Sequence, residues 1–264
     1  MGCRWSGGLL DGIAIASGLG VGLIVGITGV GGGSLMTPLL LSVFKLNPAV
    51  AIGTDLWFAC LTKVSGSVAH ARHGHVNWPI VRRLLAGSVP ASIATIALMH
   101  LSGVTKGWAS ALTFSLGIAL LLTAVVVAFK QSWQALGLRL ERWIPESRKP
   151  ALTVISGLIL GVLVSLSSIG AGAIGATLIL LIYPRLKARD IVGTDIAHAV
   201  PLTLVAGLGH ASLGNVHWEL LVSLLIGSLP GIWLGAQLTR RLPDGVVRSL
   251  LCASLLMAGW KVIH

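Results

Sequence analysis

The stretch GITGVGGGSLMTPLL, residues 26–40, decides how the fold is interpreted, because it places five glycines and one proline, without any charge, in an apolar chain. The 264-residue chain has a mean hydropathy of +0.90, is 55% hydrophobic and carries only 10% charged residues. Soluble domains carry about 25% charged residues. The composition therefore indicates an integral membrane protein, and the glycines predict that one of its helices is interrupted.

Ten apolar runs of helical length follow one another along the chain, so we predict an all-α membrane protein with about ten helical segments. The runs cover residues 9–28, 29–44, 49–69, 79–100, 107–129, 151–168, 169–184, 190–210, 218–239 and 244–263. Segments 2 and 7, the runs 29–44 and 169–184, fall short of the roughly 20 residues that cross a bilayer core. We expect both to be tilted, broken or partly re-entrant.

The formal charge of +11 comes from Lys and Arg residues that gather between the apolar runs. This is the pattern that membrane topology requires, so we expect the lipid bilayer, and no nucleic acid, as the partner of these residues. The cysteines Cys3, Cys60 and Cys252 are too few and too scattered for a disulfide framework or a metal site. We expect no cofactor.

An internal repeat relates the two halves of the chain. A shift of 140 residues matches Gly53-Thr54-Asp55 with Gly193-Thr194-Asp195, His70-Ala71 with His210-Ala211, Trp78 with Trp218, and Gly87-Ser88-x-Pro90 with Gly227-Ser228-x-Pro230. A shift of 139 matches Gly31-x-Gly33 with Gly170-x-Gly172. We predict a first membrane repeat at 1–129, a basic linker at 130–150 and a second membrane repeat at 151–264.

The second repeat is predicted to be inverted, because each copy holds an odd number of segments. With the linker in the cytoplasm, most Lys and Arg residues fall on its side of the membrane. The copies also differ in the expected sense, since Arg82 and Arg83 become Val222 and Ser223. If the short segments returned to their starting side, the basic residues at 185–189 would be external. Charge therefore favours two inverted five-segment repeats.

Glycine-interrupted short segments at matching places in inverted repeats are typical of secondary transporters, whose substrate site lies where the helices break. Free N–H groups at the start of a half-helix carry partial positive charge, which suits an anion. Candidate substrate-binding residues are Thr28, Gly31, Gly32, Gly33, Ser34, Ser167, Ser168, Gly170 and Gly172, with Thr37 as a further hydroxyl donor. The alternative for any single glycine is close helix packing.

Few ionisable residues lie within the apolar segments, where charge is costly and usually functional. Asp55 and Asp195 occupy equivalent positions in the two Gly-Thr-Asp motifs. They are either helix caps near the membrane edge or residues that gate or couple transport.

Lys63 lies well inside the run 49–69, and Thr203 replaces it in the second copy. We hypothesise that Lys63 is the fixed cation that faces an anionic substrate, with His198 at a similar depth as a proton partner. The alternative is that the side chain of Lys63 extends along the bundle toward water.

The segment His70-Ala-Arg-His73-Gly-His75 resembles a metal cluster, but its counterpart keeps only His210. No acidic or Cys ligand stands beside it in the sequence, so we expect no metal site. His70 and His210 remain candidates for coupling or gating because both copies carry them.

The chain resembles the sulfite exporter TauE/SafE family of bacterial membrane proteins. The resemblance rests on Gly29-Val-Gly-Gly-Gly33 followed by Pro38-Leu-Leu, on Pro48-Ala-Val-Ala-Ile-Gly53-Thr54, on Gly74-His-Val-Asn-Trp78 and on Gly87-Ser-x-Pro90. It covers essentially the whole chain. The second glycine-rich stretch departs from the first, because it lacks the proline that matches Pro38.

The resemblance implies a transporter of the bacterial inner membrane that exports a small sulfur-containing anion, such as sulfite or an organosulfonate. It implies that the proton gradient or the membrane potential drives transport. An anion channel or an importer of a related small anion is the alternative. An enzyme is not expected, because no nucleophile–base pair or metal cluster is evident. The sequence leaves open the particular anion, the direction, the coupling ion and the oligomeric state.

Overall fold

The computed structural model describes residues 11–28, 33–102 and 106–239, together with 249, 252–253 and 255–256. Over these residues the chain forms ten α-helices, one short 3-10 helix and no strand. The helices are α1 (Gly12–Thr28), α2 (Gly33–Ser42), α3 (Pro48–Arg72), α4 (Trp78–Leu101), α5 (Lys106–Ala128), α6 (Lys130–Leu140), the 3-10 helix (Glu146–Arg148), α7 (Lys149–Ser167), α8 (Ala173–Ile182), α9 (Ala188–Ser212) and α10 (Trp218–Thr239).

The predicted all-helical architecture is confirmed, with one addition in the linker. Nine of the ten predicted segments coincide with helices of the structure, and the tenth, 244–263, lies mostly outside the described residues. The linker 130–150 also contains α6, which the sequence analysis did not predict. This helix packs on α8, where Gly137 comes close to the backbone of Leu180 and to Pro184. Tertiary packing therefore supports a helix that composition alone does not indicate.

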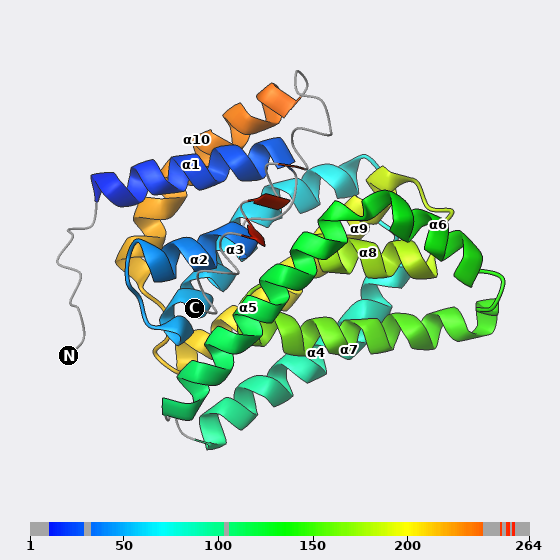
Figure 1. The fold of residues 1–264 in the computed structure, drawn as a ribbon, viewed down its shortest axis with the longest axis horizontal. Coiled ribbons are helices and arrows are strands. Elements are labelled where there is room, and N and C mark those ends of the chain that lie inside the picture. The colour runs from blue at the N-terminus through cyan, green and yellow to red at the C-terminus, as the bar shows by residue number, and fades with distance from the viewer. Residues whose placement is uncertain are drawn as a thin grey trace.

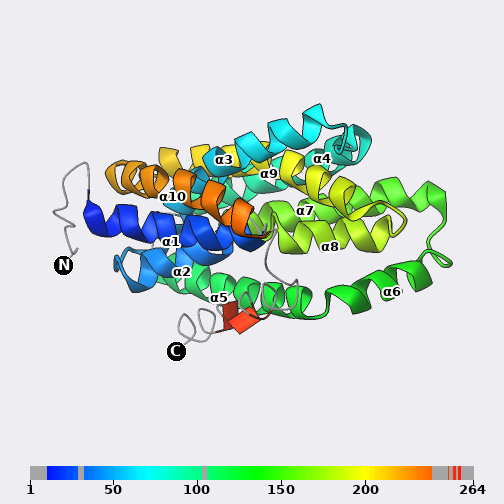
Figure 2. The ribbon, with the colours of Figure 1, turned by 90° about the horizontal axis from the view of Figure 1, so that it is seen from above.

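The helices pack in pairs that join the first half of the chain to the second. Helix α1 lies beside α10, α4 lies beside α7, and α3 packs against α9 (Figure 1). Seen from above, α5 and α6 lie together on one side of the bundle (Figure 2). The pairs α1–α10, α4–α7 and α3–α9 each join segments that are distant in sequence.

Glycines make two of these pairs possible at close range, and they do so in matching ways. A Cβ added at Gly22 of α1 would collide with the carbonyl oxygen of Ser228 on α10. A Cβ added at Gly161 of α7 would collide in the same way with the carbonyl oxygen of Ser88 on α4. Small residues allow such backbone contact between membrane helices. The equivalent pairs of helices therefore use equivalent contacts.

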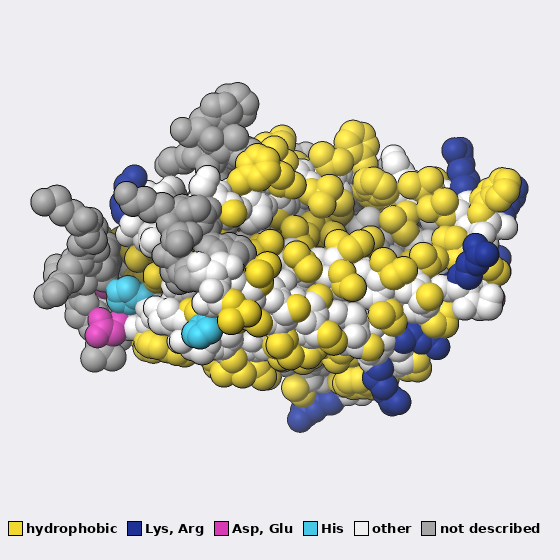
Figure 3. Space-filling view, turned by 90° about the horizontal axis from the view of Figure 1, so that it is seen from below, with side chains coloured by type: hydrophobic (Ala, Val, Ile, Leu, Met, Phe, Trp, Pro, Cys, Tyr) yellow, Lys and Arg dark blue, Asp and Glu magenta, His cyan; other side chains and the backbone are white. Residues whose placement is uncertain are grey.

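Within the described part of the chain, five helical stretches are long and apolar enough to cross a membrane. They are residues 78–101, 110–128, 146–167, 188–212 and 218–235. Large hydrophobic side chains remain exposed along these helices, and hydrophobic surface covers the middle of the molecule (Figure 3). Such a surface is stable against lipid rather than water. The chain is a multi-pass membrane protein.

Helix α8 is a half-length segment that returns toward the start of α7. Its 10 residues extend about 15 Å, which is half of the roughly 30 Å hydrocarbon core. The hydroxyl groups of Thr153 on α7 and Tyr183, just after α8, lie 2.9 Å apart. The predicted short segment 169–184 is therefore confirmed, and it begins in the interior of the bundle. Helix α2 also has 10 residues, and residues 29–32 before it lie outside the described part.

One end of the molecule is basic, and we call it the basic end. It holds the junction of α3 and α4, the segment between α6 and α7, and the junction of α8 and α9, as contacts of Arg83, Glu141 and Arg185 show. Arg185 Nε lies 2.9 Å from Glu141 Oε2, and Arg83 Nη1 donates to the Tyr183 hydroxyl at 3.4 Å. Lys and Arg side chains gather at this end (Figure 3). Arg185 therefore lies against the linker residue Glu141.

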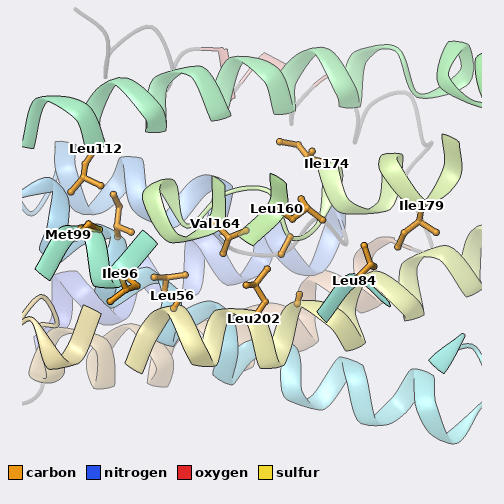
Figure 4. Packing of buried hydrophobic residues seen from close by; sticks show 14 of the residues in the cluster. Leu56, Leu84, Ile96, Met99, Leu112, Leu160, Val164, Ile174, Ile179 and Leu202 are labelled. Atoms are coloured by element: carbon orange, nitrogen blue, oxygen red, sulfur yellow. The ribbon is translucent and has the colours of Figure 1, made fainter. Parts of the chain in front are cut away.

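A hydrophobic core between the helix pairs holds the interior in place. Leu160 and Val164 of α7 point toward Leu202 of α9, and all three are fully buried (Figure 4). The cluster continues through Leu56 of α3 and Leu84 of α4. This packing fixes the depth at which α3, α7 and α9 face one another, and the polar residues described next lie on these same helices.

Candidate transport site

Lys63 lies well inside α3 and is buried, with 8% of its surface exposed, whereas Lys149, the other buried lysine among the described residues, is the first residue of α7. The Nζ of Lys63 donates a hydrogen bond of 2.6 Å to the carbonyl oxygen of Ala171. Ala171 belongs to the non-helical segment 168–172 between α7 and α8, which we call the break. A cation of the first half therefore reaches the broken segment of the second half.

The break has a backbone that few residues adopt. Ser168 has a φ of 58°, Gly170 a φ of 128° and Gly172 a φ of 146°. Conformations like those of the two glycines are accessible at little cost only without a Cβ. The Ser167 hydroxyl accepts a hydrogen bond from the Ile169 N–H at 3.2 Å, which holds the turn from within. The predicted site residues Ser167, Ser168, Gly170 and Gly172 thus lie together.

Two buried carboxylates each face the short helix of their own half. Asp55 on α3 is fully buried and accepts a hydrogen bond through Oδ2 from the Thr37 hydroxyl of α2. Asp195 on α9 is 2% exposed, and its Oδ1 lies directly against Gly175 in the first turn of α8. A Cβ at Gly175 would collide with that oxygen. The glycine therefore makes room for the carboxylate.

Lys63 interacts electrostatically with both carboxylates. None of the ion pairs found among the described residues joins it directly to Asp55 or Asp195. The Oδ1 atoms of both aspartates and the Oγ of Ser168 are buried without a hydrogen-bond partner, and Ser168 lies near the Asp55 carboxylate. Unpaired buried polar atoms are rare in folded proteins. Around the Lys63 ammonium the protein thus keeps hydrogen-bonding capacity that it does not itself use.

The Gly-Thr part of each Gly-Thr-Asp motif holds a loop of the other half. Thr54 accepts a hydrogen bond of 3.0 Å from the N–H of His217, and Thr194 accepts one of 3.0 Å from the N–H of Asn77. A Cβ at Gly53 would collide with the carbonyl oxygen of Asn215. Likewise, one at Gly193 would collide with the carbonyl oxygen of His75. Glycine and threonine therefore fix the loop, and aspartate is left to face inward.

The helix-cap alternative for the two aspartates is wrong. Helix α3 begins at Pro48, where the side chain of Asn47 accepts a hydrogen bond from the Ala49 N–H at 3.0 Å. Helix α9 begins at Ala188. Asp55 and Asp195 lie about two turns further on and are buried, so neither can cap a helix end.

His198 lies near Lys63, but its side chain is hydrogen-bonded to another helix, α4. Its Nε2 is 2.9 Å from the Ser88 hydroxyl of α4, while its Nδ1 is buried without a partner. Lys63 acts on it electrostatically. His198 is therefore in the surroundings of Lys63, at the interface of α4 and α9.

The other two histidines lie toward opposite ends of the bundle. His210 Nε2 is 2.9 Å from the carbonyl oxygen of Ser165 near the end of α7. His70 lies near the basic end, with its ring centroid 6.1 Å from that of His75. His75 in turn lies 3.3 Å from Asp190. Among the described residues, no group of three or more His, Cys, Asp or Glu side chains is arranged to hold a metal ion.

Most of the first glycine cluster, residues 29–33, lies outside the described part of the chain. Gly31 and Gly32 lie outside the described residues, and so do the side-chain surroundings of Thr28, Gly33 and Ser34. The contribution of the Ala171 carbonyl was missed by the sequence analysis. A backbone acceptor leaves no signal in residue type, although the flanking Gly170 and Gly172 mark the segment.

Comparison with known proteins identifies relatives over nearly the whole chain. Residues 14–262 match the family described as sulfite exporter TauE/SafE. The Bacillus subtilis protein YjnA, named a probable membrane transporter protein, is 37% identical over 94% of this chain and 98% of its own length. A second probable membrane transporter protein of that organism, YdhB, is 27% identical over 90% of this chain and 94% of its own. No solved structure matches the chain.

Proposed function

Since the chain belongs to the sulfite exporter TauE/SafE family of membrane transporters, we propose that it exports a small sulfur-containing anion, such as sulfite or an organosulfonate, across the cell membrane. The observation that carries this proposal is the buried Lys63 ammonium at the break between α7 and α8. The family description is the basis for proposing a sulfur-containing substrate. The buried cation beside unused hydrogen-bonding groups is the basis for proposing that the substrate is an anion.

Lys63 is the fixed cation of the proposed site. Its present partner is a neutral carbonyl, which an anionic oxygen can replace with a stronger hydrogen bond because both partners are then charged. Ser168 lies in the same break, and its buried hydroxyl, which lies beside the Asp55 carboxylate, can donate to a second oxygen of the anion. The pyramidal sulfite ion and the sulfonate group each present several oxygens, so such an anion can engage both groups at once.

Transport proceeds in this proposal by alternating access of two inverted repeats. Matched contacts in the two halves support it. The contact of Gly22 with Ser228 corresponds to that of Gly161 with Ser88, and Thr54 and Thr194 each hold a loop of the opposite half. The helix pairs α1–α10 and α4–α7 are the natural rigid units, because glycine contacts join them at backbone distance. Rocking of one unit against the other would then open the site to each side in turn.

The basic end faces the cytoplasm in this proposal. Its Lys and Arg residues satisfy the positive-inside rule in that orientation. The linker 130–150 with α6 then lies on the cytoplasmic side.

Counterflow in proteoliposomes tests the function. Purified protein is reconstituted into vesicles loaded with unlabelled sulfite, and entry of radiolabelled sulfite is followed against protein-free vesicles. A carrier gives transient accumulation that saturates with concentration, whereas a channel gives none above equilibration. Currents on solid-supported membranes with thiosulfate, sulfoacetate, taurine, sulfate and chloride then rank the substrates. Absence of counterflow with every sulfur anion would overturn the proposal.

A further inference from the structure

We propose that Asp55 and Asp195 are the groups that carry the coupling proton, so that anion and proton cross the membrane together. This inference rests on the transport function proposed above and names its coupling ion and the residues responsible. It follows from the juxtaposition of one buried ammonium with two buried carboxylates, each of which has an unpartnered oxygen.

The charge balance of the cluster requires a proton when an anion binds. With Lys63, Asp55 and Asp195 all ionised, the cluster already carries one excess negative charge. An incoming anion adds at least one more in an interior where unbalanced charge is costly. Protonation of the carboxylates removes this excess and leaves the Lys63 ammonium to the anion.

Other side chains do not supply the missing positive charge. Among the described residues, the titratable group that faces both carboxylates is Lys63, which itself faces Cys60 and His198. The short helices α2 and α8, which the carboxylates contact, carry no titratable side chain. One lysine therefore has to serve two carboxylates and the substrate.

Both aspartates are built to accept a proton. Thr37 donates its hydrogen bond to Oδ2 of Asp55, so Oδ1 stays available. Oδ1 of Asp195 is likewise buried and unpartnered beside the start of α8. Each aspartate thus has a fixed position on a long helix, α3 or α9. Each also has an oxygen without a hydrogen-bond partner next to a short helix, α2 or α8.

His198 is less suited to the role that the sequence analysis gave it. Ser88 engages its Nε2, and the equivalent position of the first repeat is Phe58. The aspartates, by contrast, occur in both halves and face the short helix in each. A group that exists in both halves can meet water on either side as the two halves exchange access.

The cycle has no covalent step. Anion binding at Lys63 accompanies protonation of Asp55 and Asp195, and release of the anion accompanies loss of the protons to the same side. Lys63 then lies again beside two ionised carboxylates, so the empty carrier returns with the one excess negative charge of the unprotonated cluster. Protons therefore move with the anion, so an inward proton gradient favours uptake, and net export requires an outward anion gradient that exceeds it.

The test separates exchange from coupling, with Asp55→Asn and Asp195→Asn as isosteric variants and radiolabelled sulfite as the probe. Wild-type vesicles should show counterflow at equal pH, and an inward proton gradient should concentrate sulfite beyond the level in protein-free vesicles. The double variant should lose gradient-driven accumulation, measured relative to its own counterflow rate. Thermal melting checks that it is folded, and His198→Gln, paired with Ser88, should retain coupling.

The outcomes are distinct. Counterflow without any response of the wild type to the proton gradient would overturn the proton coupling and leave the transporter in place. Gradient-driven accumulation that persists in the folded double variant would overturn the assignment to the two aspartates. Absence of wild-type counterflow would overturn the transport function and this inference with it. If Asp→Asn changes prevent folding, Asp→Glu variants, which retain the titrating group, should restore coupled uptake; if they fold and remain uncoupled, the assignment is wrong.

Discussion

Lys63 Nζ on α3 lies 2.6 Å from the carbonyl oxygen of Ala171 in the break between α7 and α8. This contact joins a charged residue of one half to the irregular backbone of the other. A buried ammonium held by a neutral acceptor, with carboxylates nearby but not in direct ion pairs, is poised to exchange its partner. Most of the predictions below concern the residues around this contact.

Lys63→Gln should raise the KM for anion transport about tenfold or more, since a charge-assisted hydrogen bond contributes ~1.5–3 kcal/mol. Radiolabelled sulfite counterflow over a range of concentrations measures it. Lys187→Gln, which removes an exposed lysine of the basic end, is the matched control and should leave KM unchanged. An unaltered KM in a folded Lys63→Gln protein would favour a lysine that only extends toward water.

Gly175→Ala should slow transport, because the added methyl group occupies the position of Asp195 Oδ1 and displaces the carboxylate. The measured quantity is the initial rate of proton-driven sulfite uptake per folded protein. Gly20→Ala on α1, where an added Cβ meets nothing within 4 Å, is the control. Equal rates for both variants would mean that the position of Asp195 does not matter for transport.

Gly22→Val should destabilise the α1–α10 pair by about 1–3 kcal/mol, because the larger side chain overpacks a contact at backbone distance. Thermal melting in detergent reports the loss. Gly20→Val, two residues away on the same helix and facing open space, supplies the comparison and should melt close to wild type. A Gly22→Val protein as stable as Gly20→Val would show that α1 and α10 do not need this close approach.

Thr194→Val should destabilise the protein by about 1–3 kcal/mol, because the Asn77 N–H loses its acceptor while the shape is kept. Thermal melting and hydrogen exchange of the segment 75–77 measure the effect. Thr203→Val is the control, since the Thr203 hydroxyl donates to the carbonyl oxygens of Ala199 and Val200 in its own helix. Faster exchange at 75–77 in the Thr194 variant alone is expected, and its absence would contradict the loop-holding role.

Cysteine labelling in intact cells tests the orientation of the molecule. In a background without Cys3, Cys60 and Cys252, a membrane-impermeant maleimide should label Ser212→Cys in intact cells. It should label Ser147→Cys in the linker only after permeabilisation. Both positions are exposed, so access alone decides the result. The reverse pattern would place the basic end outside.

Much of this architecture can be predicted from the sequence, because its signals are local or repetitive. Apolar runs mark the helices, and the repeat marks Gly53 and Gly193, which do make equivalent contacts with the loops of the opposite halves. Other features depend on tertiary packing and leave no local signal. Helix α6 is supported by its contact with α8, and the Ala171 carbonyl is a backbone atom. The helix-cap interpretation of Asp55 was wrong although the predicted run 49–69 begins one residue from the observed start of α3 at Pro48.

The exchange of loops between the halves has a consequence for biogenesis. The N–H that bonds Thr54 belongs to His217, and α1 packs on α10. The ribosome therefore completes the first half long before its contact surfaces can be filled. Until the later helices enter the bilayer, those surfaces must be shielded by lipid or by the insertion machinery, so neither half is expected to mature as a separate polypeptide.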